Sequence, residues 1–159
     1  TDFLTYEEMT AAQIIREIEK YPCQNVILTG GEPMLNDLWP LRRLFNERGY
    51  HISIETNGTI VIDEGLIDWI CVSPKDQLYP NTKIKQRTGD ELKCVYVGQD
   101  LSLYDGLISG FDNLFLQPCY IESESVEWNG RNFAQTESLV KMNPTWRLSL
   151  QTHKWMGID

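Results

Sequence analysis

Short apolar runs recur along the chain, and each one stops at a polar or glycine-containing string. The runs are Val26–Leu28, Tyr50–Glu55, Ile67–Val72, Glu91–Val97, Asn113–Pro118 and Trp146–Leu150. Between several of them, apolar residues recur at the three- and four-residue spacing of an amphipathic helix. Strands that alternate with helices predict an α/β fold with a parallel sheet, and ligands of such folds bind at the C-terminal ends of the strands.

The helical segments have recognisable ends. The first helix is predicted to begin at a capping box formed by Thr5 and Glu8 and to end before Pro22. The second is predicted to begin after Asn36 or Asp37 and to end at Gly49. The remaining stretches predict a short helix at 101–108, an acidic surface loop at 121–131 and a helix at 132–142.

The first strand runs into a turn with two glycines, a carboxylate and a proline, at residues 30–33. Glycine lets a ligand approach the backbone because no Cβ is in the way, and Pro33 fixes the direction in which the chain leaves. Taken alone, two glycines more often mark a strand-to-helix connection that binds nothing. Two later residues need a partner or a role: Lys93 lies in an apolar run, and Glu55 ends a strand.

The turn belongs to an ordered set of strings. Gly30-Gly31-Glu32-Pro33 resembles the turn with which radical S-adenosylmethionine (SAM) enzymes hold the amino group of the cofactor's methionine moiety. The strings that follow it are Ile54–Thr59, Val72–Lys75, Glu91–Lys93, Leu116–Pro118 and Trp146–Lys154. Together they resemble the 7-carboxy-7-deazaguanine synthase family over nearly the whole chain.

The resemblance implies a fold and a reaction. The fold would be an incomplete, modified βα barrel of the radical SAM type, with about six strands in the intact protein and the first of them upstream of residue 1. The enzyme would be a carbon–nitrogen lyase that converts 6-carboxy-5,6,7,8-tetrahydropterin to 7-carboxy-7-deazaguanine with loss of ammonia, in queuosine and deazapurine biosynthesis. The family also implies a flavodoxin-type electron donor and a homodimer.

The resemblance also assigns roles to residues. It places SAM on Gly30, Gly31, Glu32, Pro33, Ser73, Pro74, Lys75, Gln117, Pro118, Cys119 and Tyr120, although the family often has another pair at 119–120. It places the pterin on Thr29, Glu55, His153 and Asp159, with Glu55 and His153 as the catalytic residues, and Mg²⁺ on Thr1. Without the family, Glu55–Thr59 could be a polar turn, and Lys75 a solvated charge.

The cysteines conflict with this assignment. Cys23, Cys71, Cys94 and Cys119 are dispersed and form no CxxC pair, which is typical of small buried hydrophobic residues. Radical SAM enzymes hold a [4Fe–4S] cluster on three closely spaced cysteines. Thr1-Asp2-Phe3 resembles the family's sequence just after the last of these, so the cluster ligands are expected upstream of this chain.

Composition sets further bounds. The chain has 159 residues, of which 42% are hydrophobic, and no linker-like stretch divides it, so we expect a single domain over 1–159. A net charge of −9 argues against nucleic acid as a partner. No apolar run approaches the ~20 residues of a membrane span. We therefore expect a cytoplasmic protein that binds neither nucleic acid nor membrane.

Two alternatives stay open at this point. One is another radical SAM enzyme, such as an activase that makes a glycyl radical on a partner protein. The other is a non-catalytic domain that binds a pterin or nucleoside, because the sequence lacks the usual trio of cluster cysteines.

Overall fold

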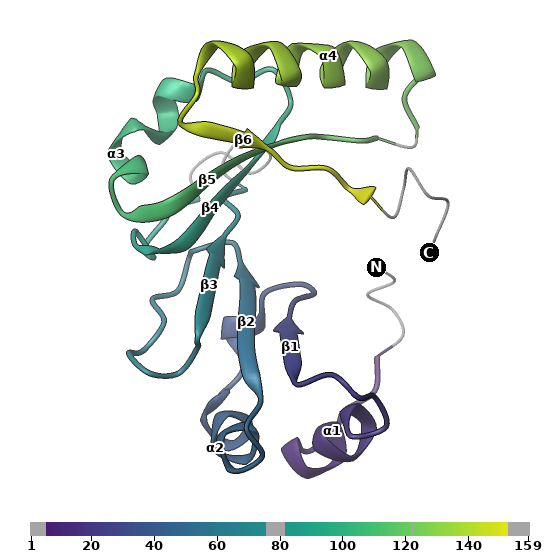
Figure 1. The fold of residues 1–159 in the computed structure, drawn as a ribbon, viewed down its shortest axis with the longest axis vertical. Coiled ribbons are helices and arrows are strands. Elements are labelled where there is room, and N and C mark those ends of the chain that lie inside the picture. The colour runs from purple at the N-terminus through teal and green to yellow at the C-terminus, as the bar shows by residue number, and fades with distance from the viewer. Residues whose placement is uncertain (1–5, 76–81, 122, 153–159) are drawn as a thin grey trace.

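Six parallel strands form one open sheet, and their order in the sheet is their order in the chain. The structure is a computed structural model that describes residues 6–75, 82–121 and 123–152. The strands are β1 (Asn25–Leu28), β2 (His51–Thr56), β3 (Trp69–Val72), β4 (Gly89–Tyr96), β5 (Phe111–Pro118) and β6 (Trp146–Leu148). The first and last strands do not pair, so the predicted α/β class with an incomplete barrel is confirmed (Figure 1). All six strands lie within the described residues, so the count of about six is reached without the upstream strand that we expected.

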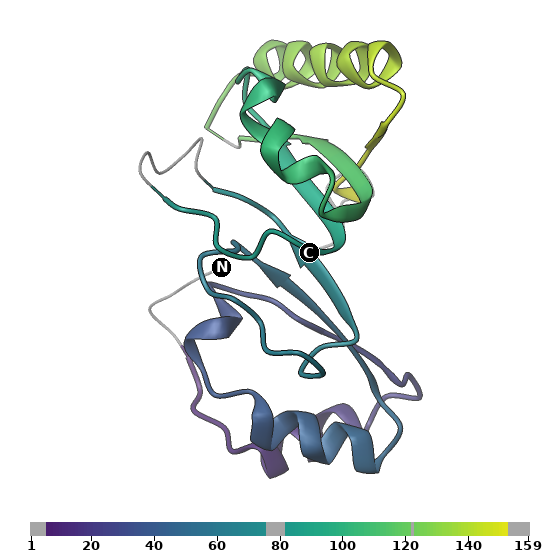
Figure 2. The same ribbon diagram turned by 90° about the vertical axis from the view of Figure 1, so that its left-hand side faces the viewer.

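Helices flank the sheet in two groups. The helical elements are α1 (Ala11–Ile18), η1 (Pro33–Leu35), α2 (Trp39–Glu47), η2 (Leu101–Tyr104), α3 (Asp105–Ile108) and α4 (Val126–Met142). Helices α1 and α2 lie at the end of the molecule that holds β1 and β2, and α3 and α4 lie at the other end, beside β4 to β6 (Figures 1 and 2). Among the described residues, no helix is long and apolar enough to cross a membrane.

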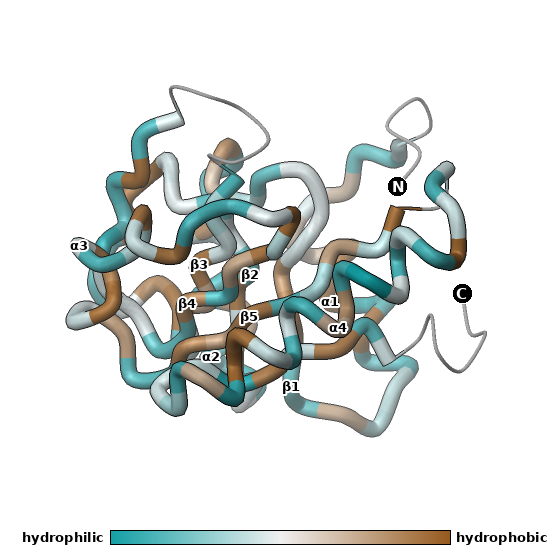
Figure 3. The backbone as a smooth tube through the Cα atoms, turned by 90° about the horizontal axis from the view of Figure 1, so that it is seen from above, coloured by the Kyte–Doolittle hydropathy of each residue, from teal (hydrophilic) through white to brown (hydrophobic). Residues whose placement is uncertain are grey.

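Each group of helices covers its own hydrophobic core. Ile15 of α1, Phe45 of α2 and Ile54 of β2 belong to one buried cluster. The second cluster joins β3 to β6 with α3 and includes Leu116 and Trp146. Many of the hydrophobic residues lie on the strands in the middle of the molecule (Figure 3). Side chains alternate along a strand, so the residues between the buried ones point to the other face of the sheet.

Two local predictions were wrong. Helix α1 is capped by Thr10, which forms a capping box with Gln13, while residues 6–10 are not helical. Thr10 and Gln13 have the same spacing as Thr5 and Glu8, so the pattern alone does not distinguish the two helix starts. Helix α4 begins at Val126, where the Ser125 hydroxyl accepts a hydrogen bond from the Trp128 N–H at 3.1 Å. Residues 126–131 are therefore helical, although their acidic and polar composition predicted a loop.

Candidate active site

The loops that leave β1, β2 and β3 enclose a polar cleft at the C-terminal edge of the sheet. The cleft has a volume of about 540 Å³. Its lining residues are Thr29, Gly30, Gly31, Glu55, Thr56, Asn57, Thr59, Ser73, Lys75 and Thr82. We call this hollow the polar cleft. It brings together six of the residues that the sequence assigned to SAM or the pterin: Thr29, Gly30, Gly31, Glu55, Ser73 and Lys75.

Glu32 fastens the glycine turn to the end of β2. One carboxylate oxygen accepts hydrogen bonds from the Thr56 hydroxyl at 2.7 Å and the Met34 N–H at 3.1 Å, and the other accepts from the Asn57 N–H at 2.7 Å. Gly30 takes φ +121°, and a Cβ there would meet no atom within 4 Å, so the glycine is needed for its backbone conformation. Glu32 and Pro33 support the cleft from behind and do not line it.

Gly58 lets the next loop close against β3. Its φ is +78°, and a Cβ would lie 2.8 Å from Cγ1 of Val72. The Gly58 carbonyl accepts hydrogen bonds from the N–H groups of Lys85 and Gln86, at 2.7 and 2.9 Å. The loop after β2 is thereby fixed to the segment that leads into β4, and the polar side chains of residues 55–59 line the cleft.

The loop after β3 supplies a cation. The Lys75 ammonium donates a hydrogen bond to the Ser73 hydroxyl at 2.9 Å. Burial lowers the pKa of Lys75, and the nearby charge of Lys93 lowers it further, while Glu55 opposes the shift. A carboxylate ligand would restore the balance of charge at this ammonium. Pro74, between the two polar residues, is buried.

Glu55 forms an ion pair with Lys93 of β4, and Oε1 of Glu55 is the acceptor. The Lys93 side chain is 16% exposed, whereas the Glu55 side chain is 41% exposed. Burial works against the charge of Lys93, but the hydrogen bond to Glu55 and the charges of Glu55 and Glu91 outweigh it and raise the pKa of Lys93. Burial raises the pKa of Cys71 to about 12, so this thiol is uncharged at neutral pH and is not a nucleophile.

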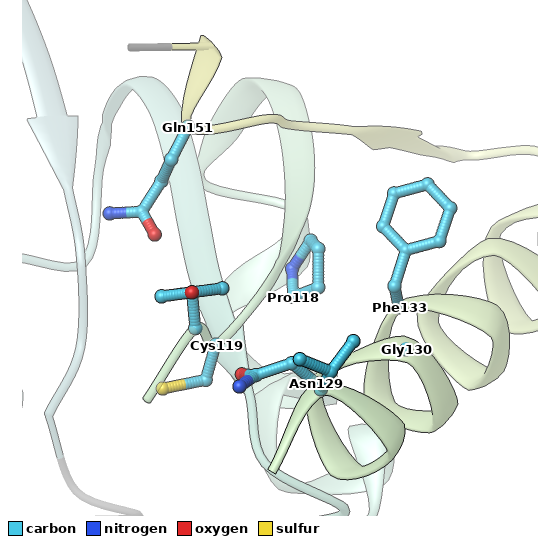
Figure 4. A pocket seen from close by; sticks show the side chains of 8 residues that line it. Pro118, Cys119, Asn129, Gly130, Phe133 and Gln151 are labelled. Atoms are coloured by element: carbon cyan, nitrogen blue, oxygen red, sulfur yellow. The ribbon is translucent and has the colours of Figure 1, made fainter. Parts of the chain in front are cut away.

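A second hollow lies farther along the same sheet edge, between the end of β5 and α4. It has a volume of about 270 Å³ and is largely apolar. Its lining residues are Pro118, Cys119, Tyr120, Val126, Asn129, Gly130, Phe133 and Gln151 (Figure 4). We call it the apolar pocket. It holds three of the four residues that the sequence assigned to the adenosyl side of SAM; the fourth, Gln117, accepts a hydrogen bond from the Ser149 hydroxyl at 3.2 Å.

Two asparagines of α4 hold the wall of this pocket. Nδ2 of Asn132 donates hydrogen bonds to the carbonyls of Tyr96 and Cys119, at 3.1 and 2.9 Å. The Asn129 amide pairs with both backbone groups of Ile121, accepting from N–H at 2.9 Å and donating to C=O at 3.0 Å. Where β5 ends, these side-chain amides form hydrogen bonds with backbone groups, as a neighbouring strand does within the sheet.

The sequence missed several of these residues. Thr56, Asn57, Thr59 and Thr82 line the polar cleft but carried no assignment. The polar string after β2 was the available signal for the first three. Asn129 and Asn132 gave no signal, because their partners are backbone atoms that only the fold brings near. Thr1, His153 and Asp159 lie outside the described residues.

An open parallel sheet with a glycine turn after its first strand and a polar cleft at its C-terminal edge is the architecture of the radical SAM class. The family model for the radical SAM superfamily matches residues 1–76. A 7-carboxy-7-deazaguanine synthase of Bacteroides thetaiotaomicron is 43% identical over 150 residues, which cover 94% of this chain and 74% of the relative. The chain belongs to the 7-carboxy-7-deazaguanine synthase family.

Further similarities agree. Synthases of Nitratidesulfovibrio vulgaris and Bradyrhizobium diazoefficiens are 39% and 42% identical, over 84% of this chain in each case. The chain spans 58% and 59% of their lengths. The crystal structure of QueE from Escherichia coli superposes with a TM-score of 0.69 at 26% identity, covering 90% of this chain and 64% of that one.

Membership of the superfamily implies SAM and a [4Fe–4S] cluster. The polar cleft and the apolar pocket fit the two ends of SAM, since one offers a cation and exposed backbone and the other an apolar surface. The described cysteines do not fit the cluster: Cys71 and Cys94 are buried in separate strands, and Cys23 is exposed far along the chain from both. Among residues 6–75, 82–121 and 123–152, no group of three metal-ligating side chains comes together.

Proposed function

We propose that this chain is the part of a 7-carboxy-7-deazaguanine synthase that binds SAM and the pterin substrate. The reaction is the rearrangement of 6-carboxy-5,6,7,8-tetrahydropterin to 7-carboxy-7-deazaguanine with loss of ammonia, which makes the enzyme a lyase. The observation that carries the proposal is the convergence of Thr29–Gly31, Glu55, Ser73 and Lys75 on one cleft. The names of the relatives support the same reaction.

Glu55 is the proposed partner of the pterin. The pterin ring carries a guanidine-like edge with two adjacent N–H donors, and a carboxylate accepts such a pair in charge-assisted hydrogen bonds. The Glu55 side chain lines the cleft and is 41% exposed, so it can be reached. Thr29, at the start of the glycine turn, also lines the cleft and offers a hydroxyl.

SAM is proposed to lie along the sheet edge. The backbone at Gly30 and Gly31 would hold its amino group, and Ser73 and Lys75 its ribose and carboxylate. Pro118–Tyr120 would contact the adenosyl side with Gln117. When bound, SAM supplies hydrogen-atom abstraction from the substrate, which is chemistry that no side chain provides. The task of this chain is to position both ligands and to balance their charges.

Several elements of the proposal rest on the family alone. They are Mg²⁺ at Thr1, contacts of His153 and Asp159 with the substrate, a flavodoxin-type electron donor, a homodimer and a cytoplasmic location. The relatives carry the synthase name, so we do not propose a glycyl-radical activase.

The test is formation of 5′-deoxyadenosine, measured by mass spectrometry after anaerobic reconstitution, with and without 6-carboxytetrahydropterin. It uses this chain and a version extended upstream with a segment that carries the three closely spaced cysteines of radical SAM enzymes. We expect the extended version to form 5′-deoxyadenosine and the pterin to increase its amount. An extended version that binds a cluster but forms no product would favour a non-catalytic binding domain.

A further inference from the structure

Lys93 has an unusual position for a lysine. It lies in the middle of β4, its side chain is 16% exposed, and its ammonium donates a hydrogen bond to Oε1 of Glu55. A lysine buried to this extent needs a partner to offset its desolvation. Its partner is the residue to which we assign the pterin, so the pair connects the inside of the sheet to the polar cleft.

The pair crosses an intervening strand. Glu55 lies opposite Cys71 of β3, and Cys71 lies opposite Glu91 of β4. Lys93 is two residues beyond Glu91, on the same face and closer to the cleft. Two strand spacings amount to ~9.6 Å, which a lysine and a glutamate side chain can bridge together. The small side chain of Cys71, between them, leaves room for the bridge.

Glu55 is therefore held by Lys93 on one side and is open to a ligand on the side of the polar cleft. Lys93 takes Oε1, while the partly exposed side chain lines the cleft. Lys75 differs from Lys93 in its partner, because its ammonium donates a hydrogen bond to the uncharged Ser73 hydroxyl. The two lysines are thus not equivalent, because one has a carboxylate and the other has none within hydrogen-bond distance among the described residues.

We propose that Lys93 is a positioning residue for the pterin: by holding Oε1 of Glu55 it orients the carboxylate so that its other oxygen meets the ligand's guanidine-like edge. It does not touch the ligand itself. It also keeps Glu55 from pairing with Lys75, which leaves that ammonium for a carboxylate ligand. This inference rests on the proposed function, since it gives a role to Lys93 through the role of Glu55.

A structural ion pair is the competing explanation. Replacing one partner of a partly buried pair changes stability, whatever the pair does for a ligand. The two explanations differ in how the effects of two substitutions combine. If Lys93 acts through Glu55, removing Lys93 matters for pterin binding only while Glu55 is present, so the two substitutions are not additive.

The experiment is a double-mutant cycle on pterin affinity. 6-Carboxypterin, the stable fluorescent oxidised form of the substrate, is titrated into this chain and into Lys93→Met, Glu55→Gln, the double variant and Lys93→Arg. Lys141→Met is the control, because Lys141 pairs with Glu137 on the exposed side of α4 at 2.8 Å. Urea unfolding of every variant identifies the concentration range in which each is folded.

We expect Lys93→Met to weaken 6-carboxypterin about tenfold in the wild-type background and less than about twofold in the Glu55→Gln background. Lys93→Arg should recover part of the affinity, and Lys141→Met should bind as wild type does. Equal losses in both backgrounds, or no loss from Lys93→Met, would overturn the inference while leaving the role of Glu55 intact. A wild-type chain that does not bind 6-carboxypterin would overturn both this inference and the proposed substrate.

Discussion

The two hollows at the C-terminal edge of the sheet are built in opposite ways. The polar cleft is formed by loops after β1, β2 and β3, and its walls are joined by the carboxylate of Glu32. The apolar pocket is formed by the end of β5 and by α4, and its wall is held by the neutral amides of Asn129 and Asn132. The polar cleft thus has a charged side chain at its walls, whereas the wall of the apolar pocket is held by neutral amides.

The difference matches the two ends of the proposed cofactor. The methionine end of SAM carries an amino group and a carboxylate, and the adenosyl end is a flat ring system. A charged ligand group needs partners that offset its desolvation, whereas a flat ring gains from apolar contact. In the proposed binding mode, the charge at one end of the sheet edge and the apolar surface at the other determine the direction in which SAM lies.

The largest effect on activity should come from removing the negative charge of Glu55 in the polar cleft. Glu55→Gln should lower pterin-dependent 5′-deoxyadenosine formation by about 100-fold, because a neutral amide oxygen accepts hydrogen bonds from the pterin edge more weakly than a carboxylate oxygen does. Its free energy of unfolding should fall by only about 1–2 kcal/mol, from the loss of the Lys93 pair. Turnover near that of the wild type would remove Glu55 from the mechanism.

The next largest effect, on stability, should come from removing the Glu32 carboxylate that joins the walls of the cleft. Glu32→Ala removes three hydrogen bonds, to the Thr56 hydroxyl and to the N–H groups of Met34 and Asn57, and should lower the free energy of unfolding by about 3 kcal/mol. Hydrogen exchange should quicken at residues 56–58 and stay unchanged at 119–121. Glu17→Ala is the control: its exposed pair with Lys20 contributes less than about 1 kcal/mol.

The matching change in the other half is Asn132→Ala. It leaves the Cys119 carbonyl without its side-chain donor, and we expect about 2 kcal/mol of destabilisation by urea unfolding. Exchange should now quicken at 119–121 and not at 56–58, which is the reverse of the Glu32 variant. Asn143→Ala, at an exposed helix end, is the control. The same exchange pattern in both variants would mean that the two hollows are one cooperative unit.

The strands and the polar cleft could be predicted from the sequence. Each apolar run became a strand, and the glycine turn and the strings at 55–59 and 73–75 came together because parallel strands end at one edge. The sequence also showed that Lys93 would need a partner. It could not name Glu55, because that depends on the order of β2, β3 and β4 in the sheet.

The apolar pocket could not be predicted in the same way. The acidic residues Glu122, Glu124 and Glu127 predict a surface loop at 121–131, whereas α4 begins within this segment, at Val126. Its asparagines act on backbone carbonyls from other strands. A motif search finds side chains that meet ligands; it does not find side chains that meet the backbone behind a ligand site.

The smallest expected effect is the pH dependence of stability at Asp68. Asp68 accepts hydrogen bonds from Arg42 at 2.7 Å and from the Ile52 N–H at 2.8 Å, within the half that holds the polar cleft. The hydrogen bond from Arg42 is the main reason that the pKa of Asp68 is lowered in the folded chain. The ionised Asp68 therefore adds to the free energy of unfolding above its unfolded pKa of ~3.9. This contribution is lost as the pH falls through the lower pKa of the folded chain.

Asp68→Asn should accordingly be about 1 kcal/mol less stable than the wild type at pH 7, and this gap should narrow below about pH 4. Urea unfolding of both proteins between pH 7 and pH 3 measures the gap. A gap that does not change with pH would show that the charge of Asp68 does not contribute.

The central claim is that the two hollows bind different parts of the ligands. The most direct measurement is an amide chemical-shift map of the ¹⁵N-labelled chain, titrated first with SAM and then with 6-carboxypterin. We expect SAM to shift Gly30, Gly31 and Lys75 together with Cys119 and Tyr120, and the pterin then to shift Thr29, Glu55 and Asn57. If SAM shifts only one of the two hollows, or if the pterin leaves residues 55–59 unchanged, the division of labour along the sheet edge is wrong.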